Sequence, residues 1–248
     1  MVVVQPKPTS SAPQRRYLRA PVPVHFPTEQ TVPESRLHLR LRTALWSMLQ
    51  LALKGRAVVG SEQFVYWDPT DPKQCVAPDI LVRFGEPDQD FASWKVWERG
   101  APHLAIEVIS EHDAPELVWE GKLAAFQRSG VVELVRFDPA DAAHPLRLWD
   151  RVEGDLVERE VSKHVLERSD VLDLYWCVES SSEFRSMLRL CRDPAGLERL
   201  LTEGEALELE AQGRRTEAEG RRAAEARADA VEARLRELEA ELARLTAR

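Results

Sequence analysis

PHLAIEVIS, residues 102–110, is the stretch that decides the fold. Pro102 in front and the polar residues that begin at Ser110 bound an apolar run of strand length. Side chains alternate along a strand, which predicts two faces: Leu104, Ile106 and Val108 on one, and Ala105, Glu107 and Ile109 on the other. Glu107 interrupts the apolar run, and a buried carboxylate must be paired, protonated or bound to a cation. We therefore expect Glu107 to have a partner.

The flanking segments supply the other elements of an α/β fold. Apolar residues at helical spacing predict a helix from Glu34 to Lys54, ended by Gly55, and a second helix over residues 115–129. Strand character is expected at residues 57–60, 64–67, 77–84 and 131–139, and in a hairpin over 145–161 that turns at Glu153-Gly154-Asp155. The first three of these strands are expected to form an antiparallel meander.

Composition limits the function. The 248 residues suit one globular domain plus an appendage, and the formal net charge of −8 gives no overall attraction to nucleic acid. A nucleic-acid partner would need a local basic patch, or a bound metal that reverses the charge of an acidic site. Cys75, Cys177 and Cys191 form no CxxC pair, which argues against a zinc knuckle or a disulfide framework and fits a reducing cytoplasm.

The two ends of the chain differ from its middle. Residues 1–32 are rich in proline and open with an apolar run too short for a signal peptide or a membrane span, which predicts a disordered arm. We expect a cytoplasmic protein with no membrane contact, with a globular domain over residues 33–203 and a charged helical tail over residues 204–248.

The tail carries a heptad seam, which predicts a coiled coil and a homo-oligomer. The seam steps by four and three through Ala224, Ala228, Val231, Leu235, Leu238, Leu242 and Leu245. Gly213 and Gly220 are expected to interrupt the helix-like stretch before the seam. The alternative is a single charged helix that is only partly formed.

Asp79, Glu107 and Lys122 are the candidate catalytic residues. Asp79 begins one expected strand, Glu107 lies inside the next, and Lys122 lies in the helix that follows. Taken singly, each has an ordinary explanation as a turn, a solvated strand residue or a solvated helix residue. Together, two carboxylates can hold magnesium or manganese, and an ammonium group can orient water or stabilise a transition state. The combination suits phosphodiester hydrolysis.

Several segments, taken together and in their order along the chain, identify a protein family more specifically than any single motif does. They are PESRLHLRLRTAL, APDILV, PHLAIEVIS with the later EGKLAAF, GVVELVRFDP and LRLCRDPAGLERLLT. These segments resemble the Uma-two family of restriction-endonuclease-like proteins, in the PD-(D/E)XK nuclease superfamily. The resemblance implies a mixed β-sheet core flanked by helices, and an endonuclease that hydrolyses DNA with Mg²⁺ or Mn²⁺ held by Asp79 and Glu107. The superfamily's usual lysine stands two residues after the glutamate, where this chain has Ile109. Similar proteins carry it on the following helix, at the position of Lys122.

A second hypothesis is a non-catalytic interaction protein that keeps this fold as a scaffold and works through its coiled coil. The acidic net charge and the displaced lysine favour it. The two hypotheses differ in whether the carboxylate pair binds metal.

Several other residues have two interpretations each. Glu34 and His38 could approach the metal site, but we favour a helix-dipole role for Glu34 and a surface position for His38. Glu62 likewise has both a metal-site and a structural interpretation. The tryptophans, among them Trp94, Trp97 and Trp119, favour packing over base stacking. The basic run QRRYLR, residues 14–19, could contact phosphates, although such a run is commonly only solvated.

Overall fold

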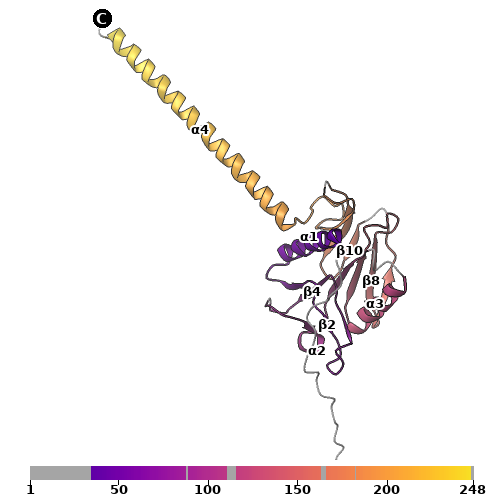
Figure 1. The fold of residues 1–248 in the computed structure, drawn as a ribbon. Helices are drawn as coiled ribbons and strands as arrows, with labels where there is room; N and C mark the ends of the chain where they lie inside the picture. Colours follow the sequence, from indigo (N-terminus) through magenta and orange to yellow (C-terminus); the bar gives the residue numbers. More distant parts are fainter. Residues whose placement is uncertain (1–34, 88, 111–115, 163–165, 182, 247–248) are drawn as a thin grey trace, which may run out of the picture.

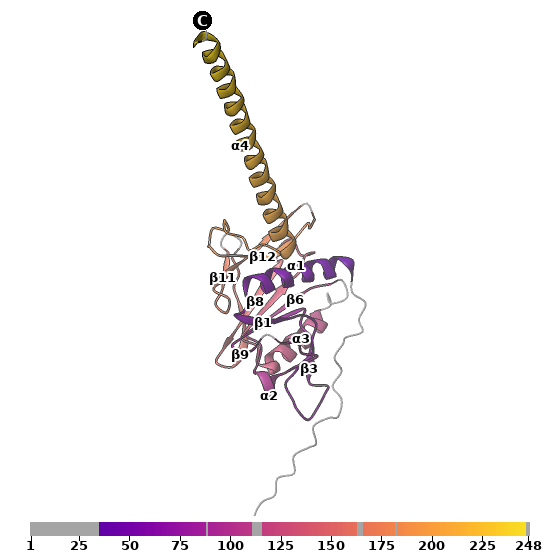
Figure 2. The same ribbon diagram turned by 90° about the vertical axis from the view of Figure 1, so that its left-hand side faces the viewer.

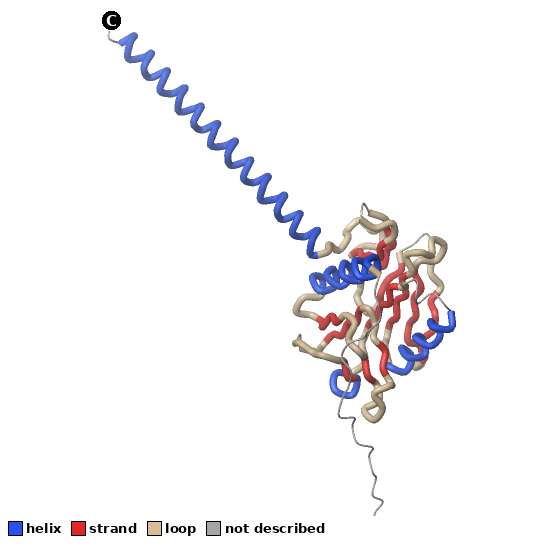
Figure 3. The backbone as a smooth tube through the Cα atoms, viewed as in Figure 1, coloured by secondary structure: helices blue, strands red, loops and turns tan. Residues whose placement is uncertain are grey.

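The computed structural model describes residues 35–87, 89–110, 116–162, 166–181 and 183–246. Its centre is a six-stranded sheet in the order β1-β4-β6-β7-β8-β9, with helices α1 and α3 on opposite faces (Figures 1 and 3). Strands β6 and β7 are parallel and the other neighbours antiparallel, which confirms the mixed sheet. The elements are β1 (Ala57–Gly60), β4 (Ile80–Phe84), β6 (Leu104–Val108), β7 (Glu133–Phe137), β8 (Leu146–Val152), β9 (Asp155–Arg159), α1 (Arg36–Ala52), the single-turn α2 (Val96–Arg99) and α3 (Glu116–Ser129).

Strand β6 divides the core in two, as its alternation predicted. All five of its residues are buried. Leu104, Ile106 and Val108 pack in the same cluster as the apolar stripe of α1, whereas Ala105 packs in the cluster of α3. Glu107 alternates with the first group and therefore belongs to the α3 face.

The expected antiparallel meander of residues 57–84 is wrong. Strand β1 pairs directly with β4, while β2 (Val65–Tyr66), β3 (Cys75–Val76) and β5 (Trp94–Lys95) form a separate three-stranded sheet. Apolar side chains of this small sheet, including fully buried Trp94, pack in the α3 cluster. Burying these side chains removes apolar surface from water, which stabilises the fold.

A third sheet, which the sequence did not suggest, follows the hairpin. It consists of β10 (Glu167–Ser169), β11 (Leu174–Glu179) and β12 (Met187–Cys191), all antiparallel. Trp176 and Leu190 of this sheet are buried in the same cluster as α1. Helix α1 therefore packs against both the main sheet and the third sheet.

The tryptophans of the described residues serve mainly as packing groups, as the sequence favoured. Trp94 is buried and donates its Nε1–H to the carbonyl of Gly100 at 2.8 Å. The buried rings of Trp119 and Trp149 lie 5.2 Å apart between centroids. Trp97 lies on the rim, with 38% of its surface exposed.

Helix α4 (Glu203–Thr246) leaves the body as one continuous helix of 44 residues (Figures 1 and 2). It runs through Gly213 and Gly220, so the expected interruption is wrong. Each glycine costs about 1 kcal/mol relative to alanine, but alanine, glutamate and arginine dominate the helix, and the Arg214–Glu210 ion pair spans Gly213. Among the described residues no helix, α4 included, is long and apolar enough to cross a membrane.

Glu133 is a buried carboxylate that joins two of the sheets. It is 1% exposed at the start of β7, and it accepts hydrogen bonds from Trp176 Nε1 at 3.1 Å and from Ser169 Oγ at 3.0 Å. Burial raises the pKa of Glu133, and the hydrogen bonds from Trp176 and Ser169 lower it by less.

Protonation of Glu133 should stabilise the fold, because the folded protein holds this proton more tightly than the unfolded chain does. That contribution is complete below the ordinary glutamate pKa of about 4.3 and is lost as the pH rises through the raised folded pKa. We expect the free energy of unfolding of the wild type minus that of Glu133→Gln, measured by urea denaturation, to fall as the pH rises from about 4 toward neutral. Glu120→Gln, at an exposed position of α3, is the control for replacing a carboxylate by an amide and is measured at the same pH values. A constant difference for Glu133→Gln would contradict the raised pKa.

Candidate active site

The main sheet places Asp79 next to Glu107. Strands β4 and β6 are antiparallel with Ile80 opposite Ile106, and continuing this register by one residue puts Asp79 opposite Glu107. Cβ atoms of opposite residues on antiparallel strands lie about 5 Å apart. Both residues are buried, with 7% of Asp79 and 2% of Glu107 exposed. The register therefore places Asp79, directly before β4, beside Glu107 of β6.

Lys122 joins this pair from the helix that covers the sheet. Its Nζ lies 3.3 Å from Oε2 of Glu107. The side chain of Glu107 is 3% exposed and that of Lys122 is 27% exposed, so the ammonium group lies between the buried acid and solvent. Helix α3 thus brings Lys122 to Glu107, which the sequence could not decide.

His38 also reaches the site, so the expected surface position is wrong. Its side chain is 11% exposed, and its Nε2 lies 3.2 Å from Oδ2 of Asp79 and 2.8 Å from the carbonyl oxygen of Val108. Because both neighbours are acceptors, Nε2 carries a proton and donates it. His38 precedes Leu41 and Leu45 at helical spacing, so it extends the buried stripe of α1. That spacing was the signal for its burial.

The backbone holds Asp79 from a second direction. The N–H of Val108 donates to Oδ2 of Asp79 at 2.6 Å. Among the described residues, both donors to this carboxylate reach Oδ2, which leaves Oδ1 the capacity for a further ligand. The carboxylate is therefore fixed in place without using both of its oxygens.

Glu62 supports the backbone around Asp79. Its φ of 64° lies in the left-handed region, its N–H donates to the carbonyl of Pro78 at 3.1 Å, and its side chain pairs with Arg42 at 3.2 Å. Arg42 also donates to Ser61 Oγ at 2.9 Å, and Ser61 Oγ donates to the Asp79 carbonyl at 2.8 Å. The side chain of Glu62 is 49% exposed, which suits this supporting role. Glu34 lies outside the described residues.

Arg136 is a further cation of the site that the sequence reasoning missed. On the parallel strands β6 and β7 it is the register partner of Glu107, and only 9% of it is exposed. Asp138 pairs with its guanidinium at 3.3 Å, and the ring of Trp119 lies beneath it at 5.3 Å. Like Glu107, Arg136 interrupts an apolar strand in the sequence, and that was the available signal.

The donor types of this site fit a hard divalent cation. Among the described residues, no group of three or more His, Cys, Asp or Glu side chains is placed to hold a metal ion. Magnesium needs fewer protein ligands, because it keeps several waters and binds through one or two carboxylates together with substrate phosphates. Asp79 and Glu107 supply two such carboxylates.

Comparison with known proteins gives one family match and a similar solved structure. Residues 28–180 match the Uma2 family, which carries the description "Putative restriction endonuclease". One similar solved structure, from Anabaena variabilis ATCC 29413, is titled as a "putative nuclease belonging to DUF820"; it is 13% identical with a TM-score of 0.42, over 57% of this chain and 76% of that chain. None of the curated proteins compared with this chain matches it. Since the family match spans more than half of the 248 residues, the chain belongs to the Uma2 family.

Proposed function

We propose that this protein is a metal-dependent endonuclease that hydrolyses phosphodiester bonds of DNA. The observation that carries the proposal is a pair of buried carboxylates, Asp79 and Glu107, with the ammonium group of Lys122 in contact with one of them. Membership of a family described as "Putative restriction endonuclease" supports the same reaction.

Asp79 and Glu107 are the residues that would hold Mg²⁺ or Mn²⁺. The ion supplies Lewis acidity toward the phosphate and toward water when it is bound. The chain fixes both ligands in advance: His38 and the Val108 N–H hold Asp79, and Lys122 holds Glu107. Ligands fixed by such neighbours need little reorganisation on binding.

Lys122 can serve Glu107 and the substrate together. An ammonium group has three donors, so one can stay on Glu107 while another orients a water molecule or contacts a phosphate oxygen. Its partial exposure gives the substrate access to it. Positive charge placed where negative charge develops stabilises the transition state of phosphodiester hydrolysis.

A protein with net charge −8 needs local cationic groups to contact a DNA substrate, and two arginines lie in a row beside Glu107. Arg136 neighbours Glu107 on β7, and Arg147 is its register partner on β8. Asp138 and Glu158 hold the two guanidinium groups in position. We propose that this row contacts DNA phosphates beside the carboxylate pair.

The second candidate is a scaffold without catalysis, and one contact favours it. Lys122 already places a positive charge beside the buried carboxylate of Glu107, so a metal ion is not needed to offset that charge. The two candidates differ in metal binding and in the effect of removing Lys122.

Asp79→Asn and Glu107→Gln should each lower DNA cleavage by at least about a hundredfold, because each removes a ligand charge from the metal site. The measurement is conversion of supercoiled plasmid in magnesium or manganese, with circular dichroism to confirm folding. Glu120→Gln, exposed on α3, is the matched control and should cleave like the wild type. Equal cleavage by the wild type and both site variants would identify a contaminating nuclease.

The Lys122→Met variant distinguishes a role of Lys122 in catalysis from its role as the cation that pairs with Glu107. Cleavage should fall by about 10²–10³-fold, the usual effect of losing one oriented donor. Without metal, the buried Glu107 carboxylate loses its cation, so stability should fall by up to about 3 kcal/mol. Magnesium should then raise the melting temperature of this variant more than that of the wild type, because it returns a cation to Glu107.

Lys54→Met, at an exposed position, is the control for the thermal measurement. It should respond to magnesium as the wild type does. No response to millimolar magnesium in the wild type or in Lys122→Met would support the scaffold instead.

We also propose that residues 33–203 form the catalytic unit and that the tail, residues 204–248, self-associates. The capacity of α4 for association comes from its row of exposed apolar residues, which includes Leu235 and Leu238. The catalytic unit has its own core, formed by both faces of the main sheet.

Deletion of residues 211–248 should convert an oligomer into a monomer without unfolding the body. The deletion keeps Glu205, which pairs with buried Arg189. Light scattering gives the mass and circular dichroism the fold. An unchanged oligomeric state would disprove association through the tail.

A further inference from the structure

The distal part of α4 exposes a continuous apolar row. The exposed fractions are 60% for Val231, 53% for Leu235, 46% for Leu238, 66% for Leu242 and 66% for Leu245. Apolar residues aligned on one side of a helix gain stability when a partner covers them. The spacing and the flanking charges of the row identify that partner.

The row has the spacing of a coiled-coil seam. The a positions are Ala228, Leu235 and Leu242, and the d positions are Ala224, Val231, Leu238 and Leu245. The positions beside the seam are mostly charged, with Glu225, Glu232 and Glu239 at e, and Arg227, Arg234 and Glu241 at g. The e side of the seam is therefore acidic, and the g side is basic at Arg227 and Arg234.

These charges select the orientation of the partner. In a parallel pair of helices, each g residue faces the e residue of the next heptad on the other helix, so Arg227 faces Glu232 and Arg234 faces Glu239. In an antiparallel pair, e faces e, which places glutamate opposite glutamate. We propose that a second copy of this chain binds α4 as a parallel, in-register coiled coil.

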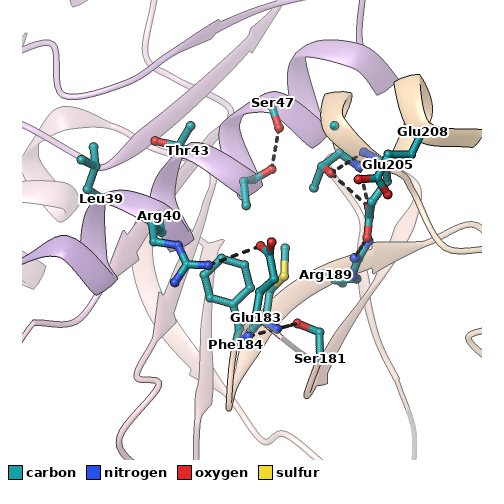
Figure 4. Close-up of a pocket in the computed structure, with 14 residues that line it drawn as sticks. Leu39, Arg40, Thr43, Ser47, Ser181, Glu183, Phe184, Arg189, Glu205 and Glu208 are labelled. Atoms are coloured by element: carbon teal, nitrogen blue, oxygen red, sulfur yellow. Dashed lines mark hydrogen bonds and ion pairs between the residues drawn. The ribbon is translucent and has the colours of Figure 1, made fainter. Parts of the chain in front are cut away.

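The base of α4 fixes the direction in which the helix leaves the body. Thr202 and Glu205 form a capping box, in which Glu205 N donates to Thr202 Oγ1 at 3.3 Å and Thr202 N donates to Glu205 Oε2 at 2.9 Å. Buried Arg189 donates to the carbonyl of Leu200 at 3.0 Å. It also donates to Glu205 at 2.9 Å (Figure 4). Since both copies share this anchor, a parallel pair holds both bodies at the same end of the coiled coil.

The coiled coil begins some distance from the bodies. The seam positions that precede Ala224 are Arg214, Glu217 and Arg221, which cannot form an apolar interface. At a rise of 1.5 Å per residue, a stalk of about 30 Å therefore separates the seam from each body. Two active sites at one end could act on both strands of a single duplex, a consequence that rests on the proposed nuclease function.

Two full-length variants test the orientation. The e variant carries Glu232→Arg and Glu239→Arg, and the g variant carries Arg227→Glu and Arg234→Glu. In a parallel pair, each variant alone places like charges at every one of these g–e contacts. The dimer dissociation constant, measured by analytical ultracentrifugation, should rise by about a hundredfold. An equal mixture restores opposite charges and should form a mixed dimer with about wild-type affinity.

Matched controls make the same charge changes on the outer side of the helix. They are Asp229→Arg with Glu237→Arg, and Arg222→Glu with Arg236→Glu, and both should dimerise like the wild type. Circular dichroism confirms that each variant keeps its helix.

Two results would overturn the proposal, and neither depends on DNA cleavage. In an antiparallel pair residues 232 and 239 carry like charges in the wild type and in the e variant, so wild-type affinity of the e variant alone would disprove the parallel orientation. A wild-type protein that sediments as a monomer would disprove the coiled coil itself. A protein that passes both tests and cleaves no DNA would disprove only the nuclease function.

Discussion

A carboxylate buried in the middle of a sheet is the constraint on which the site depends. Glu107 is 2% exposed on β6, and a buried carboxylate without compensation costs several kcal/mol. Lys122 approaches it from α3, and Arg136 is its neighbour on β7. The packing of α3 on the sheet is therefore determined by charge as well as by apolar contact. Any change in that packing separates Lys122 from Glu107.

The opposite face of the sheet contributes to the same site. Helix α1 packs its apolar stripe against β6, and His38, at the start of that stripe, bonds to Asp79 and to the Val108 carbonyl. The third sheet packs against α1 in turn, and Glu133 joins that sheet to β7 through Trp176. The geometry of Asp79 thus depends on elements far from it in sequence.

The sequence predicted helices and strands correctly wherever the periodicity of apolar residues was strong. The strand around Glu107, the two helices and the hairpin at Gly154 formed as predicted, because alternation and helical spacing specify which face is buried. Periodicity did not predict how the short strands pair. Val65 and Tyr66 form only two residues of strand, and one of the two strands that they pair with, β5, lies outside any local pattern. The predicted interruption at Gly213 and Gly220 was wrong because the helix propensity of the neighbouring residues outweighs the free-energy cost of the two glycines.

For the site, the sequence by itself determined the chemical types: Asp79, Glu107 and Lys122, with Glu107 in a buried strand. It also determined the heptad pattern of the tail, since residue spacing alone fixes which side chains share a helix face. Only the tertiary structure decided that Lys122 contacts Glu107, that His38 is buried and that Arg136 lies beside the acids. Those three facts depend on strand register and helix packing, which are set by contacts between residues distant in the chain. Helical spacing marks His38 and an interrupted apolar run marks Arg136, but neither local signal says which residues they contact.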